Sequence, residues 1–392
     1  MNFLILSVTA GEGHNSTARA IKTELESRGS YCTILDTFDY VSPELAKIIS
    51  EGYLLVTERA KYAYKIGYNL AEKRKRGDKA MRLLNYAMSD DLDHYINSDS
   101  FDAIIFTHPF AGILLDVMKV RGMIKNLTLG ILTDFTFHPY WEDCTHNDFV
   151  VTPDKLLAHQ GRRKGFLDSQ ILPYGIPINP KFAEKMPKSE AREKLGLDKN
   201  LSTFLLMGGS MGYGNISENV KKIDSCDLDR DFQLVCVCGN NQEMKEEVDK
   251  IAETSRHRIL VTGFVDYIST IMDASDCIIT KPGGLTTSES LVKGLPMIII
   301  NPIPGQEERN TQFLTNTGCA LVATKTCPIE ECIYQLLTSD SRLRTMSESI
   351  AEIAKPNSTR DVCEFLINSA YTPEIISSDN SGKDGGRIYF DI

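Results

Sequence analysis

The most informative part of this chain is the segment Lys281-Pro282-Gly283-Gly284-Leu285-Thr286-Thr287-Ser288-Glu289. The apolar run 277–280 precedes it and an amphipathic pattern follows it, which predicts a strand, a glycine turn and the start of a helix. A helix start presents unpaired N–H groups and a partial positive charge, and glycine lets a phosphate approach them closely. The segment therefore predicts a site for a nucleotide diphosphate, with Glu289 placed to accept hydrogen bonds from ribose hydroxyls.

A second interpretation of the same segment needs no ligand. Thr286 and Glu289 have the spacing of a capping box, in which two side chains satisfy the first N–H groups of a helix. Because short motifs of this kind also occur by chance, the rest of the chain has to decide between the two interpretations.

Composition narrows the class of protein. The chain has 392 residues, 42% of them hydrophobic, which predicts about two or three globular domains. A net charge of -10 argues against a nucleic-acid partner. Ten cysteines without a C-x-x-C pair predict reduced thiols in a cytosolic protein rather than a zinc site. No basic region precedes the first apolar run, and no run approaches the ~18 residues of a membrane span, so we expect neither a signal peptide nor a transmembrane helix.

Ionisable side chains follow three apolar runs of the first half. These runs predict buried parallel strands, and they end shortly before His14, His108 and Asp134. Since ligands of parallel α/β sheets bind where strands end, we expect these groups, together with His138, to line one crevice, with His14 held in a glycine loop. A carboxylate beside imidazoles is a candidate general base, and we assign that role to Asp134. The alternative is that Asp134 caps a turn and that the His-Pro pairs shape loops.

A basic segment rich in tyrosine interrupts the first half. Tyr64 and Tyr68 lie in an amphipathic helical pattern, and nine basic residues between positions 58 and 82, Arg74 and Arg76 among them, stand against three acidic ones. This combination is typical of a helix that contacts an anionic membrane surface, and a helix pair packed on its own sheet is the alternative. Trp141, the only tryptophan, lies in a predicted loop, where we expect it to be exposed toward a lipid or acceptor.

The prolines and the glycine of 174–180 predict a linker between two halves. Each half alternates apolar strands with amphipathic helices, so we predict an α/β fold of two doubly wound, Rossmann-like domains that face a cleft. The first domain, 1–180, would hold the acceptor and touch the membrane, and the second, 181–370, would hold the nucleotide. The tail 371–392 is rich in Ser, Asp and Gly, and we expect it to be disordered.

Polar loops of the second half are expected to meet the same cleft. Gly209 and Ser210 lie in a glycine-rich loop before a helix, which suits a phosphate or a sugar. Gln306 and Glu307 follow the strand after segment 281–289, so they lie at the same edge of the predicted sheet, where they can hold sugar hydroxyls.

In order and spacing, these motifs resemble the glycosyltransferases of family 28, in particular the monogalactosyldiacylglycerol synthases and processive diacylglycerol glucosyltransferases. The lipid-linked N-acetylglucosaminyltransferase of peptidoglycan synthesis is a more distant relative. The resemblance runs from Asn2 to about Leu366 and rests on Gly11-Glu12-Gly13-His14, Thr133-Asp134 with His138-Pro139, Gly175-Ile176-Pro177, Gly208-Gly209-Ser210, Pro282 to Glu289, and Gly305-Gln306-Glu307 with Asn310.

The resemblance implies the GT-B fold and an inverting transfer of a hexose from UDP-glucose or UDP-galactose to the hydroxyl of diacylglycerol or a related lipid. It implies a cytoplasmic enzyme that is peripheral at the inner face of the cell membrane, with an anionic membrane surface but no nucleic acid as a partner. It requires no metal and no cofactor besides the UDP-sugar donor. Asp227-Leu228-Asp229 has the form of a metal motif but lies in a charged loop, so we interpret it as solvated surface.

Carried over to this sequence, the resemblance implies roles for individual residues. The catalytic residues are Asp134 and His14. Phe264 falls where the family holds the base ring, and the full set of donor-binding residues is Gly209, Ser210, Phe264, Gly283, Gly284, Thr286, Thr287, Glu289, Gln306, Glu307 and Asn310. The acceptor and membrane residues are His108, His138, Trp141, Tyr64, Tyr68, Arg74 and Arg76.

Three alternatives stay open at this point. The acceptor is a polyprenyl-linked lipid instead of diacylglycerol, or the chain is a non-hydrolysing UDP-sugar epimerase, or it is a catalytically silent UDP-sugar sensor. The basic, tyrosine-rich segment argues against a soluble epimerase, which needs no membrane face. The sequence does not choose between glucose and galactose, or between one added sugar and several.

Overall fold

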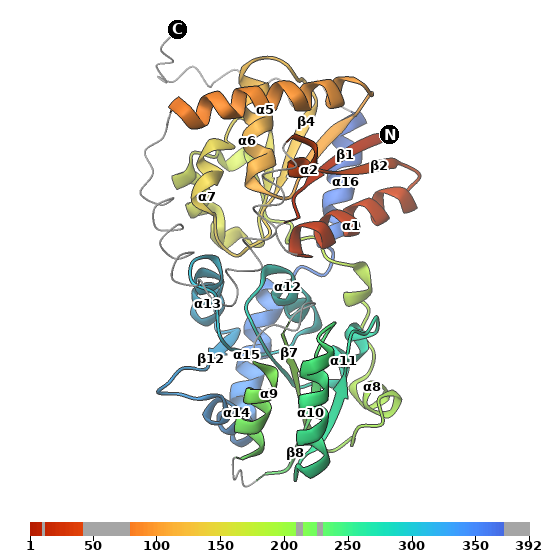
Figure 1. Cartoon of the computed structure of the whole chain (residues 1–392), viewed down its shortest axis with the longest axis vertical. Coiled ribbons are helices and arrows are strands. Elements are labelled where there is room, and N and C mark those ends of the chain that lie inside the picture. The colour runs from red at the N-terminus through yellow and green to blue at the C-terminus, as the bar shows by residue number, and fades with distance from the viewer. Residues whose placement is uncertain (10–11, 42–78, 209–214, 226–229, 372–392) are drawn as a thin grey trace.

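The computed structural model describes residues 1–9, 12–41, 79–208, 215–225 and 230–371, and these form two halves stacked along the long axis (Figure 1). The strands are β1 (Asn2–Ser7), β2 (Tyr31–Asp36), β3 (Ala103–Phe106), β4 (Leu127–Ile131), β5 (Phe149–Val151) and β6 (Ile171–Leu172) in the first half, and β7 (Ser202–Met207), β8 (Phe232–Val237), β9 (Arg258–Thr262), β10 (Cys277–Thr280), β11 (Met297–Ile299) and β12 (Ala320–Val322) in the second. The α-helices are α1 (Glu12–Ser27), α2 (Thr37–Val41), α5 (Lys79–Asn97), α6 (Pro109–Val120), α7 (Ala158–Lys164), α8 (Lys188–Lys194), α9 (Ile216–Asp224), α10 (Gln242–Thr254), α11 (Ile268–Ala274), α12 (Gly284–Lys293), α13 (Gln306–Asn316), α14 (Ile329–Thr338), α15 (Asp340–Ile353) and α16 (Ser358–Tyr371).

Within the described residues, the strands form two six-stranded sheets with the orders β2-β1-β3-β4-β5-β6 and β12-β11-β10-β7-β8-β9. Neighbouring strands are parallel throughout both sheets. The prediction of two doubly wound α/β halves is therefore confirmed. The order reverses direction between β1 and β3 in one sheet and between β7 and β10 in the other, and ligands of such sheets bind at the carboxyl ends beside these reversal points.

The strands are apolar on both faces because each sheet is covered by helices on both sides. In β1, Phe3 faces one apolar layer and Leu4 the other, and both are fully buried. Leu205 and Leu206 of β7 divide between the two layers of the second sheet in the same way. This packing fixes the strand ends from which the loops of the candidate site start.

The last described helix crosses back to the first half. Val362 and Leu366 of α16 are fully buried in the apolar layer that also contains Phe3 and Ile5 of β1, and Figure 1 places α16 beside β1. The predicted division at residue 180 stays a prediction, but α16, which sequence order assigned to the second domain, packs on the first sheet. At the crossing, Gly175 has a φ of +94°, and a Cβ there would lie 2.4 Å from Cβ of Lys355, so the two connections run side by side.

Trp141 is buried, and the prediction that it is exposed toward lipid or acceptor is wrong. Its side chain is 2% exposed, in a 3-10 helix at Pro139–Asp143, and its ring centroid lies 5.7 Å from that of Phe106. Space for the indole comes from Gly130 of β4, where a Cβ would lie 2.9 Å from the Trp141 ring. Trp141 is therefore part of the core that holds the loop after β4 in place.

Several sequence predictions fall outside the described residues: the basic tyrosine-rich segment with Tyr64, Tyr68, Arg74 and Arg76, the loop with Gly209 and Ser210, the pair Asp227 and Asp229, and the tail after Tyr371. In the part of the chain that is described, none of the helices has the length and apolar character needed to cross a bilayer.

Candidate active site between the two halves

Loops that follow strands of the two sheets touch each other. Thr133 and Asp134 come after β4, and Gly284 begins α12 after β10. A Cβ on Gly284 would lie 1.8 Å from the carbonyl oxygen of Thr133, so the two backbones are in direct contact. Figure 1 shows α12 and α13 at the level where the two halves meet. The strand ends of both halves therefore come together at one place.

His14 lies in the first turn of α1, not in a loop as predicted, because the helix already begins at Glu12. Its Nδ1 is 2.7 Å from the carbonyl oxygen of Thr107. A carbonyl can only accept, so Nδ1 carries the proton and Nε2 keeps a lone pair. Burial lowers the pKa of His14, and the hydrogen bond to Thr107 opposes this shift only in part. The neutral ring with a basic Nε2 is the form expected at neutral pH, and it can accept a proton.

His108 and His138 each cap the start of a helix. Nδ1 of His108 accepts a hydrogen bond of 3.1 Å from the N–H of Phe110, and Nδ1 of His138 accepts one of 3.3 Å from the N–H of Tyr140. The ring centroids of His14 and His108 are 4.8 Å apart. Burial holds the pKa of His108 well below its ordinary range, and the charges of His14 and His138 act in the same direction. The two His-Pro pairs therefore shape local structure, and the acceptor contact assigned to these histidines stays a prediction.

The carboxylate of Asp134 is held by a residue of the other half. Its Oδ1 accepts a hydrogen bond of 2.8 Å from Nδ2 of Asn310 in α13. Burial raises the pKa of Asp134, and the hydrogen bond from Asn310 lowers it. The neighbouring Thr133 places its Oγ1 3.3 Å from Nδ1 of His14. The two candidate catalytic residues thus lie at the same strand ends.

The start of α12 has no side-chain cap, so the interpretation of segment 281–289 as a capping box is wrong. Its N-cap residue is Gly283, and a Cβ on Gly283 would meet nothing within 4 Å. Within the part of the chain that the structure describes, no side chain caps the first-turn N–H groups, which is the arrangement that favours an anion. Gly284 differs, because its missing side chain makes room for the backbone of Thr133.

Glu289 lies on the second turn of α12 and is half-buried. Burial raises the pKa of Glu289 to about 8, and the charge of Lys181, which follows the linker, lowers it in part. Among the described residues, the charge of Lys181 only partly offsets this burial, which suits a carboxyl group whose hydrogen bonds are completed by hydroxyl groups of a ligand.

The raised pKa makes a prediction for stability. Because the pKa of Glu289 lies above the ordinary value of 4.5, the native protein binds more protons than the unfolded chain between about pH 4.5 and 8. The free energy of unfolding then falls as the pH rises through this window. Glu289→Gln is expected to be more stable than wild type above pH 8, with the difference shrinking toward pH 5, in thermal unfolding without ligand. Parallel curves for the two proteins would contradict the shift, and Glu253→Gln, an exposed change on α10, is the control.

The residues predicted to bind the donor differ in how far their side chains are exposed. Thr287 and Asn310 are fully buried, so neither side chain is open to a donor in this arrangement. Thr286 is half-buried on the first turn of α12. Phe264, after β9, is 66% exposed, and an exposed ring of this kind is what stacking against a nucleobase requires.

An ion pair at the ends of β10 and β11 was missed by sequence reasoning. Nζ of Lys281 lies 3.5 Å from Oε1 of Glu307, and Oε2 of Glu307 accepts a hydrogen bond of 2.6 Å from the N–H of Ile303. Burial raises the pKa of Glu307, while Lys281 lowers it. The signal was available, since Lys281 opens the segment 281–289 and Glu307 follows the neighbouring strand. Glu307 is therefore partly engaged within the protein, and its sugar contact stays a prediction, as does that of Gln306.

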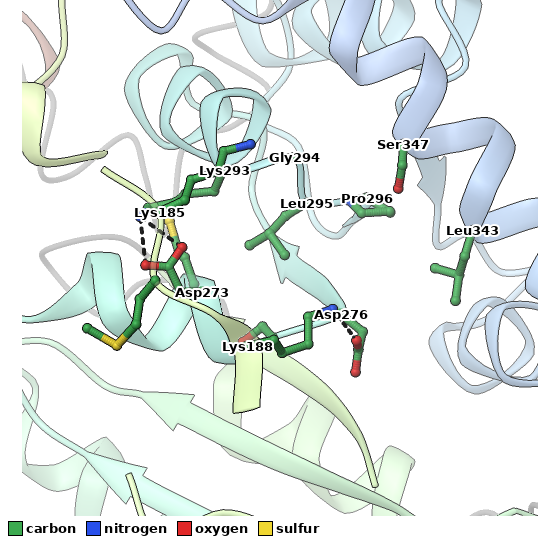
Figure 2. A pocket seen from close by; sticks show the side chains of 13 residues that line it. Lys185, Lys188, Asp273, Asp276, Lys293, Gly294, Leu295, Pro296, Leu343 and Ser347 are labelled. Atoms are coloured by element: carbon green, nitrogen blue, oxygen red, sulfur yellow. Dashed lines mark hydrogen bonds and ion pairs between the residues drawn. The ribbon is translucent and has the colours of Figure 1, made fainter. Parts of the chain in front are cut away.

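A hollow of about 260 Å³ lies at the opposite edge of the second sheet (Figure 2). Asp276 and Pro296, just before β10 and β11, belong to its lining. Two of its lysines are paired, with Nζ of Lys293 2.8 Å from the carboxylate of Asp273 and Nζ of Lys188 2.5 Å from that of Asp276. Because it lies at the amino ends of the strands, this hollow is separate from the candidate site.

Each half of the chain matches a known protein family. Residues 14–178 match the monogalactosyldiacylglycerol (MGDG) synthase family, and residues 203–361 match the glycosyltransferase family 28 C-terminal domain. The processive diacylglycerol beta-glucosyltransferase of Bacillus pumilus is 28% identical over 371 residues, covering 94% of each chain. The enzyme of the same name from Bacillus subtilis is 27% identical over 372 residues, covering 94% of this chain and 95% of its own.

Solved structures support the fold. MurG of Acinetobacter baumannii aligns with a TM-score of 0.62 at 14% identity, over 94% of this chain and 99% of its own. UDP-GlcNAc 2-epimerase of Neisseria meningitidis, bound to UDP-GlcNAc, aligns with a TM-score of 0.57 at 12% identity, over 94% and 100%. These likenesses confirm the GT-B fold but do not separate a transferase from an epimerase, whereas the two family matches do. The chain is a glycosyltransferase of family 28 whose first half is of the monogalactosyldiacylglycerol synthase type.

Proposed function

We propose that this protein transfers a hexose from a UDP-sugar to the hydroxyl group of diacylglycerol, with inversion at the anomeric carbon. The relatives that match along almost the whole chain are named for diacylglycerol glucosylation, which supports diacylglycerol as acceptor and favours glucose as the sugar. The first-half family is named for a galactolipid, so galactose is the second donor to test.

One observation carries this proposal. Asn310 joins the carboxylate of Asp134 to the carbonyl of Pro282, directly before the uncapped start of α12, through hydrogen bonds of 2.8 Å and 2.9 Å. A candidate base and a candidate anion site are therefore adjacent, one from each half. An inverting transfer needs this arrangement, because the acceptor hydroxyl and the leaving diphosphate lie on opposite sides of one carbon.

The reaction proceeds as a single displacement. Asp134 takes the proton of the acceptor hydroxyl, and Nε2 of His14 helps to hold that hydroxyl. The oxygen forms its bond to the anomeric carbon as the bond from that carbon to the diphosphate oxygen breaks. UDP leaves with the electron pair, and the N–H groups at the start of α12 stabilise its charge. Phe264 stacks on the uracil ring, and Glu289 accepts hydrogen bonds from the ribose.

The acceptor is a membrane lipid, so the proposal includes action at an anionic bilayer surface. The basic surplus between positions 58 and 82 supports this. Its contribution follows from charge, since each basic residue near an anionic surface adds about 1 kcal/mol of attraction.

The test is product formation by purified full-length protein with vesicles that contain diacylglycerol and anionic lipid. UDP-glucose and UDP-galactose are supplied in separate reactions, and zwitterionic vesicles are run beside anionic ones. We expect a glycolipid from one donor, formed faster on anionic vesicles. UDP binding without glycolipid from either donor would overturn the diacylglycerol proposal. An isomer of the supplied UDP-sugar would instead indicate an epimerase, and product on a polyprenyl phosphate alone would indicate the other acceptor.

A further inference from the structure

We propose that Asn310 is a positioning residue. Through it, the contact between the two halves sets the orientation and the ionisation of the catalytic base Asp134. This inference rests on the proposed function and adds a residue to it. The resemblance to the family had placed Asn310 among the donor-binding residues, and the geometry points to a different task.

The side chain of Asn310 makes three hydrogen bonds within the protein. It is 0% exposed, and its Nδ2 donates to Oδ1 of Asp134 at 2.8 Å and to the carbonyl of Pro282 at 2.9 Å. Its Oδ1 accepts a hydrogen bond of 2.8 Å from the N–H of Phe135. Both amide protons and one oxygen lone pair are therefore engaged, and two of the three partners belong to the other half of the chain.

These bonds hold the base and its backbone together. Asn310 bonds to the side chain of Asp134 and to the N–H of Phe135, so it holds two consecutive residues of the loop after β4. On the other side of that loop, the backbone of Thr133 rests directly on Gly284. The segment that carries the base is thus clamped by α12 and α13, and its position depends on the two halves being in contact.

The charged groups around the site explain why the hydrogen bond from Asn310 matters for the ionisation of Asp134. Asp134 raises the pKa of Glu307, at the start of α13, by repulsion between like charges, and Lys281, whose Nζ lies 3.5 Å from Oε1 of Glu307, lowers it. From the first half, the imidazole of His14 is linked to the residue before Asp134, because Nδ1 of His14 lies 3.3 Å from Oγ1 of Thr133. The hydrogen bond from Asn310 lowers the pKa of Asp134, in opposition to its burial, and so favours the ionised form that a base requires.

The experiment measures kcat and donor KM across pH for wild type, Asn310→Ala and Asn310→Asp. Loss of a hydrogen bond to a carboxylate should move the acidic limb of the kcat profile upward by about one pH unit in Asn310→Ala. Asn310→Asp keeps the shape and the bond to Phe135, but adds a like charge, so its limb should move further. UDP affinity, measured by calorimetry, should stay unchanged in both variants.

A double-mutant cycle separates positioning from donor contact. Replacing Asn310 with Ala should lower kcat at least tenfold in the wild-type background but have little effect when Asp134→Asn is already present, because that variant has no base whose position and ionisation Asn310 could set. Asn147→Ala is the matched control, since Asn147 is also fully buried and its side-chain amide donates to the carbonyls of Gly112 and Cys144, both in the first half. It should lower stability and leave the pH profile in place.

The outcomes are distinct. An acidic limb that stays in place, or a rise in donor KM that persists in the Asp134→Asn background, would overturn the positioning role and return Asn310 to the donor site. If wild type forms no glycolipid, the proposed function fails before this question is reached. If wild type is active and the two effects add, only the present inference fails.

Discussion

Asp134→Asn is expected to lower kcat for glycolipid formation by about 10²–10⁴-fold, the usual contribution of a positioned general base. The substitution preserves the shape of the side chain, and its amide oxygen can still accept the hydrogen bond from Asn310. The contact between the halves and the start of α12 are then unchanged, so UDP affinity should be retained. The measurement is initial rate against donor concentration, with UDP binding followed by calorimetry on the same preparations.

His14→Ala is the comparison that shows whether Asp134 or His14 is the base. In wild type, the imidazole of His14 also has a basic nitrogen, Nε2, since Nδ1 donates to the carbonyl of Thr107. If Asp134 is the base and His14 holds the acceptor, His14→Ala should be the milder change and should act mainly on acceptor KM. A nearly active Asp134→Asn beside an inactive His14→Ala would exchange the two roles.

Gly284→Ala is expected to lower kcat by about 10²-fold, because a misplacement of about 1 Å between reacting groups has an effect of that size. The added methyl group would lie 1.8 Å from the carbonyl oxygen of Thr133, and a backbone atom cannot turn aside as the end of a side chain can. The loop that carries Asp134 therefore has to move away from α12. Stability should also fall, by about 1–3 kcal/mol, because the added group forces the backbone of Thr133 to shift.

Gly283→Ala is the matched control for this change. A Cβ there meets nothing within 4 Å and its φ of -66° suits any residue, so the two halves keep their contact. If the diphosphate lies on this turn, Gly283→Ala should raise donor KM and leave kcat nearly unchanged. A Gly284→Ala protein with normal kcat would show that the contact between the halves is not needed for catalysis.

Much of the fold was predictable because its elements are marked locally. Apolar runs such as 2–8 and 202–207 are long enough for buried strands, and glycine loops or histidines mark where the strands end. The candidate site could be predicted in outline for the same reason, since strand order alone brings the residues after β1, β3 and β4 to one edge. Glu289 and Phe264 also lie in environments that suit the predicted roles, since Glu289 is half-buried and Phe264 is exposed.

What the sequence could not reveal depends on partners far away in the chain. The burial of Trp141 requires the absence of a side chain at Gly130 on a neighbouring strand. The role of Gly284 becomes clear only from the structure, in which Thr133 lies against it. In a sequence, a glycine that makes room for a phosphate cannot be told from one that makes room for a neighbouring backbone. Asn310 stands 176 residues from its partner Asp134, and no spacing rule connects positions so far apart.

The return of α16 to the first sheet has a consequence for how this protein is made. One face of β1 is covered by residues 358–371, which leave the ribosome after every other described element has been synthesised. The first half therefore cannot complete its core while the chain is growing, and its apolar face stays open until the second half has been translated. A chain that terminates before position 358 would expose the side chains around Phe3 and Ile5, and such a surface attracts chaperones and promotes aggregation.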